Sequence, residues 1–199
     1  MPRRSKEEAA QTRTAIIDRA VQTASIEGLE GVTIGRLADD LGMSKAGVIG
    51  HFGDKTTLQR ATFHQATKIF TAEVWERSRS KPHGLPRLSA ICENWIKHLT
   101  NPPFPGGCFM CTVAHEWDAR QGDIHDEVRE NWRLWLKVLA NEARIARDQR
   151  ELPQDTDPDQ VAFELNAIAM ALNQSLQLFE DRRAPARARR AVRRVLNQS

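Results

Sequence analysis

Three side chains in the second half of the chain could do chemistry. Cys108 and Cys111 form a C-x-x-C pair, and His115 follows four residues later. On one helix these side chains share a face, and two thiolates with an imidazole could hold zinc or another soft metal. The same two thiols could instead act as a redox switch. Buried packing cysteines are the favoured interpretation, because a lone C-x-x-C lacks a second pair of ligands.

His115 also begins a stretch that could serve acid–base chemistry, since Glu116 and Asp118 follow it. Many helix surfaces carry such a combination. The sequence has no glycine-rich phosphate loop, no G-x-S-x-G elbow and no H-E-x-x-H motif. We therefore assign no catalytic residue, no cofactor and no resident metal, and predict that the chain is not an enzyme.

The composition is that of an ordinary soluble domain. Of 199 residues, 40% are hydrophobic and 28% are charged, and the formal net charge is +3. This mild basic bias is compatible with a nucleic-acid partner without requiring one. Three cysteines and no secretory signal predict a reducing, cytoplasmic location. The longest purely apolar run, 167–172, is far shorter than the ~20 residues that span a bilayer.

Apolar residues recur at helical spacing along the whole chain, and no segment alternates with a period of two. The sequence therefore predicts an all-α fold of about nine helices. A Pro/Gly loop at 100–108 and a turn in the stretch 151–160, with Pro158 as the first helical residue after it, interrupt the pattern. The expected helices span 6–27, 34–41, 45–52, 54–79, 85–99, 108–119, 123–150, 158–180 and 184–197.

The second and third of these helices are separated by a three-residue turn that begins with Gly42. Thr33 and Ser44 stand at the two N-cap positions. This arrangement predicts a helix-turn-helix, whose second helix lies in the DNA major groove. Gly47 and Gly50 each cost roughly 1 kcal/mol inside a helix. A backbone that must approach DNA closely gives a reason to keep them.

The stretch Thr12–Ala61 resembles the DNA-binding region of the TetR family of bacterial transcriptional regulators. The resemblance rests on these landmarks: Ala20, Gly28, Thr33, Leu37-Ala38, Gly42-Met43-Ser44, Gly47, His51-Phe52 and Lys55. It implies an all-helical homodimer with a reading head at 1–55, linked by helix 54–79 to a divergent domain at 56–199. That second domain usually binds a small molecule. The segments PFPGGCF and ELPQDTDPDQVAFEL are similar, more weakly, to one C-terminal subgroup of the family.

By the family pattern, phosphate contacts are expected near the helix starts, and base contacts from the third helix. Thr33, Ser44 and Lys55 would touch phosphate, although the first two cap helices in any case. The family usually has a tyrosine where this chain has Ile49, so one phosphate contact is expected to be missing and the affinity modestly lower. A basic arm, Arg3, Arg4 and Lys6, could enter a minor groove or stay solvated. The predicted DNA-binding residues are Thr33, Ser44, Lys45, Ala46, Gly47, Ile49, Gly50, His51 and Lys55, with Ala46 able to touch a thymine methyl group.

Helix 158–180 is the predicted dimer helix, because its centre, AIAMAL, is apolar on every side and must be buried on more than one face. The predicted interface residues are Phe163, Ala167, Met170, Ala171, Leu172, Val192 and Val195. Seven arginines at 182–194 surround the last apolar stripe. A solvated face is their favoured interpretation, and a surface for nucleic acid or an acidic partner is the alternative.

Large apolar side chains between the helices of the second domain are candidates for the wall of an effector pocket. At helical spacing such residues are more often core than pocket. The candidates are Trp75, Trp95, Phe104, Cys108, Phe109, Trp117, Trp132, Trp135 and Met170.

Together these observations predict a dimeric regulator, a repressor by the resemblance, that a small molecule releases from a palindromic operator in double-stranded DNA. The half-sites would lie about 34 Å apart or a multiple of it. The expected partners are operator DNA, an unknown effector and a second copy, with no membrane. The alternatives are a thiol- or metal-responsive regulator using Cys108, Cys111 and His115, and a helical scaffold or enzyme that has lost DNA binding.

Overall fold

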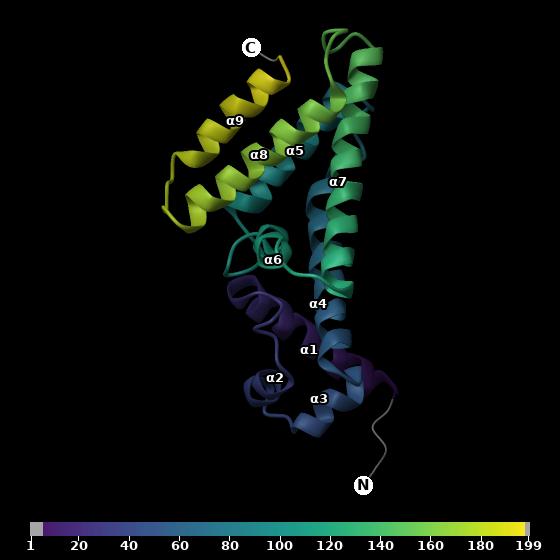
Figure 1. Ribbon diagram of the computed structural model, residues 1–199, viewed down its shortest axis with the longest axis vertical. Helices are drawn as coiled ribbons and strands as arrows, with labels where there is room; N and C mark the ends of the chain where they lie inside the picture. Colours follow the sequence, from purple (N-terminus) through teal and green to yellow (C-terminus); the bar gives the residue numbers. More distant parts are fainter. Residues whose placement is uncertain (1–5, 198–199) are drawn as a thin grey trace. The chain divides into compact units, whose positions relative to one another are not determined.

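The computed structural model describes residues 6–197, and the predicted all-α class is confirmed for this part of the chain (Figure 1). Arg3 and Arg4 of the predicted arm lie outside the described residues. The nine α-helices within 6–197 are α1 (Lys6–Glu27), α2 (Ile34–Leu41), α3 (Lys45–Phe52), α4 (Lys55–Phe70), α5 (Leu85–Thr100), α6 (Phe109–Trp117), α7 (Asp123–Asp148), α8 (Pro158–Gln177) and α9 (Ala184–Val195).

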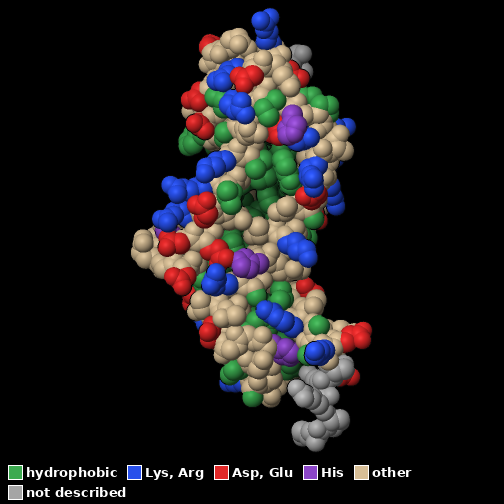
Figure 2. All heavy atoms as spheres, turned by 90° about the vertical axis from the view of Figure 1, so that its right-hand side faces the viewer, with side chains coloured by type: hydrophobic (Ala, Val, Ile, Leu, Met, Phe, Trp, Pro, Cys, Tyr) green, Lys and Arg blue, Asp and Glu red, His purple; other side chains and the backbone are tan. Residues whose placement is uncertain are grey.

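The predicted single helix 54–79 changes its winding beyond α4. A π-helical turn follows at Thr71–Trp75, and a 3₁₀ turn follows at Glu76–Ser78. None of the described helices is long and apolar enough to cross a membrane. On the face that Figure 2 displays, basic and acidic side chains are interspersed.

The chain forms two compact units, which divide it differently from the predicted boundary near residue 55. Unit 1 comprises Met1–Lys68 and Phe104–Ile124, and unit 2 comprises Ile69–Pro103 and His125–Ser199. The loop after α5 and helix α6 thus pack with the predicted reading head. The functional division into a head and an effector domain stays a prediction.

In unit 1, α1 packs against α2, α3 and α6. Ile16, Ala20 and Ala24 of α1 are fully buried, at the i, i+4 spacing that places them on one stripe. Val48 and Phe52, one turn apart on α3, are also buried. The guanidinium of Arg13 lies 4.3 Å from the centre of the Phe52 ring. These contacts fix α3 to α1 by its inner face and leave its outer face open.

Two contacts within unit 1 join the segment 104–117 to the end of α1. The carboxylate of Glu116 accepts hydrogen bonds from the backbone N–H of Leu29 at 2.7 Å and of Glu30 at 2.8 Å. A Cβ atom at Gly106 would overlap the carbonyl oxygen of Ser25, so this position needs glycine. The N–H of Gly106 donates to the Ser25 hydroxyl at 3.2 Å.

In unit 2, α5 packs against α8 and α9, and α8 lies beside α9 (Figure 1). The guanidinium of Arg189 donates two hydrogen bonds to Glu93, at 2.9 and 3.0 Å, which joins α9 to α5. These bonds lower the pKa of Glu93, and burial partly opposes them. Two more carboxylates cap the start of α5: Glu142 accepts from Gly84 at 2.9 Å and Glu151 from Leu85 at 2.7 Å.

Candidate DNA-binding interface

The outer face of α3 carries four of the predicted DNA-binding residues. Lys45, Ala46, Ile49 and Gly50 are exposed. Lys45 precedes Ile49, and Ala46 precedes Gly50, by one turn, so the four positions form adjacent rows on one side of the helix. This side borders the buried stripe of Val48 and Phe52 along the helix. His51 is half-buried and lies outside these two rows, beside the buried Val48 on the helix surface.

Both predicted N-caps are present in the two short helices. The Thr33 hydroxyl accepts from the N–H of Arg36 at 3.2 Å, and the Ser44 hydroxyl accepts from the N–H of Gly47 at 3.0 Å. Between the helices, Gly42 has φ +62° and donates back to Ala38 and Asp39. These bonds and the left-handed backbone at Gly42 end α2 and direct the chain into the turn before α3. Phosphate contacts by Thr33 and Ser44 remain predictions.

Lys55 has a partner that sequence reasoning missed. Its ammonium group lies 2.8 Å from the carboxylate of Glu30, which itself accepts from Gln59 at 3.2 Å. The hydrogen bond from Lys55 is the main cause that lowers the pKa of Glu30 below 4.5. Both Lys55 and Glu30 are about two-fifths exposed, so the ion pair is solvated and weak. A phosphate at Lys55 would have to compete with this carboxylate.

The two glycines of α3 differ in what surrounds them. A Cβ atom at Gly47 would lie 3.3 Å from the Ser44 hydroxyl, the group that caps the helix. A Cβ atom at Gly50 would meet nothing within 4 Å. The contact with Ser44 thus explains why a glycine suits position 47. No contact of the described residues explains the glycine at position 50.

The C-x-x-C pair is buried. Cys108 and Cys111 have 0% and 1% of their surface exposed, and the pKa of Cys111 is raised, first by a hydrogen bond with Cys108 and then by burial. His115 directs Nδ1 at the carbonyl oxygen of Cys111, 2.8 Å away. Among the described residues, no three His, Cys, Asp or Glu side chains are grouped to hold a metal. The metal-responsive alternative therefore lacks a site there, and the pair fits the packing interpretation.

The predicted pocket residues fall into both units. Phe104 and Phe109 belong to unit 1, where Phe109 packs on Phe63 with ring centres 6.3 Å apart. Cys108 and Trp117 belong to the same unit, and both are buried. In unit 2, Trp75 lies beneath Arg87, 5.9 Å from the ring centre, and Met170 is half-buried on α8.

Three of the predicted tryptophans form one cluster in unit 2 with Phe70, which was not among the predicted pocket residues. The rings of Phe70, Trp95 and Trp135 meet edge to face, with centroids 5.1–6.0 Å apart, and Trp132 lies 6.4 Å from Trp95. The indole nitrogens of all three tryptophans are buried without a hydrogen-bond partner. Such groups are rare in native proteins, because burying an unpaired donor is costly.

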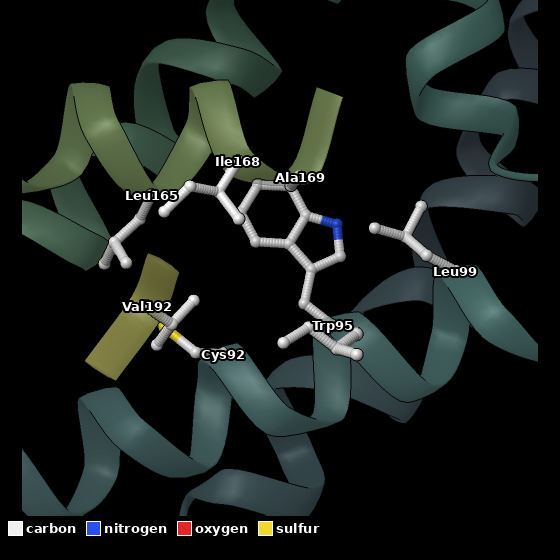
Figure 3. Close-up of a pocket in the computed structure, with 8 residues that line it drawn as sticks. Cys92, Trp95, Leu99, Leu165, Ile168, Ala169 and Val192 are labelled. Atoms are coloured by element: carbon white, nitrogen blue, oxygen red, sulfur yellow. The ribbon is translucent and has the colours of Figure 1, made fainter. Parts of the chain in front are cut away.

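A small apolar cavity of about 10 Å³ adjoins this cluster (Figure 3). Trp95 separates Ala169 from Leu99 in this view, and its indole nitrogen points away from Cys92 and Val192. The cavity has room for about one water molecule and too few polar partners to hold it. An effector would therefore have to enlarge it.

Some of the predicted dimer-interface residues are exposed on the surface of the protomer, and others are buried inside it. Phe163, Ala167 and Ala171 are exposed at i, i+4 and i+8 along α8. Leu172 and Val192 were predicted at the interface but are 2% and 9% exposed, because they pack between α5, α8 and α9 inside the protomer. Sequence reasoning missed Leu178 and Phe179, which are 66% and 65% exposed just beyond α8.

Two family models match the chain. The model of the tetR family of bacterial regulatory proteins matches residues 16–62, and that of the tetracyclin repressor-like C-terminal domain matches residues 84–192, more than half of the chain. The chain therefore belongs to the TetR family and is a DNA-binding transcriptional regulator. Regulators of this family are not enzymes, so the enzyme alternative is excluded.

Individual relatives agree with this assignment. The HTH-type transcriptional regulator AcrR of Shigella flexneri is 31% identical over 80 residues, 40% of this chain and 32% of AcrR, so the match spans about a third of that protein. The structure of a TetR regulator from Chloroflexus aurantiacus J-10-FL has a TM-score of 0.88 at 19% identity, covering 97% and 98% of the two chains. AibR, solved with isovaleryl coenzyme A and operator DNA, has a TM-score of 0.74 at 20% identity, covering 94% and 97%. At these identities the structures show a shared fold.

Proposed function

We propose that the chain is a homodimeric repressor that binds a palindromic operator and is released by a small-molecule effector. The observation that carries this proposal is the outer face of α3, which is fixed from behind by Val48 and Phe52 and open in front. Helix α3, which spans only Lys45–Phe52, is short enough to lie in a major groove about 12 Å wide. AibR, which has the same fold, was solved with operator DNA and an acyl coenzyme A.

The dimer is supported by the apolar face of α8. Phe163 is 65% exposed, and Ala167 and Ala171 continue its row with small side chains. Beside them a groove of about 240 Å³ between α8 and α9 is lined by small residues, Ala184, Ala188 and Ala191 among them. Small residues allow close helix approach, and a two-fold axis would place this face against itself.

For the effector site, our proposal is the cluster of Phe70, Trp95, Trp132 and Trp135. Three indole N–H groups buried there without an acceptor would be satisfied by oxygen atoms of a ligand, since indole only donates. The faces of the rings favour a flat, apolar molecule. We therefore expect a planar effector that bears carbonyl or similar acceptor oxygens, and Trp132→Phe to weaken its binding relative to the matched Trp75→Phe.

Release would follow from a population shift. A ligand that binds one arrangement of the dimer better than another raises its population. When that arrangement separates the heads by a distance that the two half-sites do not match, the operator is lost.

The testing experiment is the selection of bound fragments from sheared genomic DNA of the source organism by the purified protein. A dimeric operator-binding regulator recovers a few fragments that share an inverted repeat, with half-sites about one helical turn or a multiple of it apart. If the folded, dimeric protein enriches no sequence, the proposed function is wrong, and the helical scaffold without DNA binding takes its place.

A further inference from the structure

Ile49 is an exposed hydrophobic side chain on a helix that buries its other large apolar residues. Its side chain is 43% exposed, whereas Val48 and Phe52 of the same helix are 0% and 6% exposed. It therefore contributes little to the core. Ile49 also stands where the family pattern has a tyrosine that contacts phosphate, and the hydrocarbon side chain of isoleucine cannot donate a hydrogen bond.

The outer face of α3 is poor in groups that could read polar base edges. Of its four exposed positions, only Lys45 carries a donor, and Ala46 and Ile49 are apolar. In the major groove, the one apolar feature of a base pair is the 5-methyl group of thymine. Apolar side chains of α3 thus match thymine and offer nothing to guanine, cytosine or adenine edges.

Gly50 supplies an independent observation. A Cβ atom there would meet nothing of the described chain within 4 Å, and the backbone is ordinary helix. A glycine in such a place costs stability, roughly 1 kcal/mol relative to alanine, and the fold does not require it. Its open side lies on the exposed face with Ala46, one turn earlier. We attribute it to clearance for the partner, which lets the backbone of α3 come close enough for short side chains to reach the bases.

We propose that Ile49 and Ala46 read thymine methyl groups in each half-site, with Gly50 providing the clearance. The position that the family pattern gives to a phosphate contact would here select sequence instead. This inference rests on the proposed operator binding. It names the feature that the operator must have: a thymine at a fixed place under Ile49 in both half-sites.

The test uses the operator recovered by genomic selection. Each thymine of the half-site is replaced, one at a time, by uracil, which differs only by lacking the methyl group. The dissociation constants of the full-length wild-type protein and of Ile49→Ala are then measured by fluorescence anisotropy. For wild type, we expect the thymine under Ile49 to be among the sensitive ones: its replacement should weaken binding about fourfold in one half-site and about 15-fold in both, the factors that ~0.8 kcal/mol per methyl group gives.

For Ile49→Ala, replacement of that same thymine by uracil should change the affinity less than twofold, because the contact is already lost. Lys45→Ala is the control: it should weaken binding to the thymine and uracil duplexes by the same factor. The inference is overturned if no thymine is sensitive in wild type, or if Ile49→Ala keeps the full sensitivity. Failure of the proposed function would look different, since wild type would then enrich no operator at all.

A substitution at an exposed position should leave the fold intact, which thermal unfolding of Ile49→Ala checks. Ile49→Val gives a second reading that does not depend on a large truncation. It keeps a branched apolar side chain, and it should retain part of the thymine preference. If the wild-type protein binds the thymine duplex better than the uracil duplex but Ile49→Val binds the two equally well, the apolar contact is not graded as proposed.

Discussion

At the scale of single residues, the structure distinguishes side chains that hold the head together from those left for a partner. Thr33 and Ser44 act as N-caps whatever else they touch. Gly47 lies against one of these caps, whereas Gly50 faces open space. Substitutions that test DNA binding are therefore best made at residues such as Gly50, which the fold itself does not require.

Gly50→Ala should stabilise the protein and weaken DNA binding. Alanine favours the helix by about 1 kcal/mol, and its methyl group has room in the free protein. On DNA the same methyl group would hold α3 away from the bases and cost about fivefold or more in affinity, roughly 1 kcal/mol for a disturbed base contact. Urea unfolding gives the first quantity, and operator titration gives the second. Equal affinity for wild type and variant would remove the clearance argument.

Glu30→Gln should strengthen DNA binding, because it releases Lys55 from an ion pair at 2.8 Å. The plot of log affinity against log salt should steepen by up to about one, the contribution of one more phosphate contact. Glu130→Gln, which alters an exposed pair in α7, is the matched control. If Glu30→Gln leaves both affinity and slope unchanged, Lys55 does not contact phosphate.

The same pair gives a pH dependence. The folded-state pKa of Glu30 lies below its ordinary value of 4.5, chiefly because of the hydrogen bond from Lys55. Its contribution to stability is therefore present above that ordinary value and is lost as the pH falls through the lowered pKa. The difference in unfolding free energy between wild type and Glu30→Gln should be constant near neutral pH and should vanish in acid. A difference that grew in acid would contradict the assignment.

At the scale of elements, helix α6 is held to the end of α1 by one carboxylate. Glu116 satisfies two backbone N–H groups beyond the last turn of α1. Such charge-assisted bonds are stronger than neutral ones. Sequence reasoning considered Glu116 only for acid–base chemistry, because nothing in the local pattern shows which distant backbone groups it meets.

Glu116→Ala should lower the free energy of unfolding by about 2 kcal/mol, since two donors lose a charged acceptor at once. The amides of Leu29 and Glu30 should also exchange faster with solvent deuterium. Glu130→Ala, on an exposed helix face, is expected to change stability by less than about 0.5 kcal/mol. Unchanged exchange at Leu29 and Glu30 would show that the two bonds do not persist in solution.

At the scale of the whole molecule, the proposed repressor needs two copies, because a palindrome is read by two heads. We propose that the exposed row on α8, Phe163, Ala167 and Ala171, forms the contact between the two copies, with the arginine-rich α9 beside it. Arg189 is already paired with Glu93. The remaining arginines fit the solvated face that the sequence favours.

Phe163→Glu should weaken the dimer by more than about tenfold, because it places a charge in an apolar contact. Operator affinity should fall in parallel. Leu134→Glu is the matched control: Leu134 is 54% exposed on α7, away from the α8 row. Sedimentation equilibrium measures the dimer dissociation constants of both variants. A Phe163→Glu variant that dimerises like wild type would move the interface to another surface.

The sequence by itself determined the helical class, most helix boundaries and the position of the reading helix. These features depend on local signals: apolar spacing, N-cap residues such as Thr33 and Ser44, and a glycine at the turn. The family followed from the same short motif. Each of these signals acts within a few residues, so it can be read along the chain.

Only the tertiary structure decided which distant groups meet. It paired Lys55 with Glu30, placed Glu116 on the backbone after α1, and buried Leu172 and Val192 that sequence reasoning had put at an interface. It also gathered Trp95, Trp132 and Trp135 with Phe70, and it showed open space among the described residues where a side chain at Gly50 would lie. A helical stripe shows that a residue faces something, but what it faces depends on packing between segments far apart in the sequence.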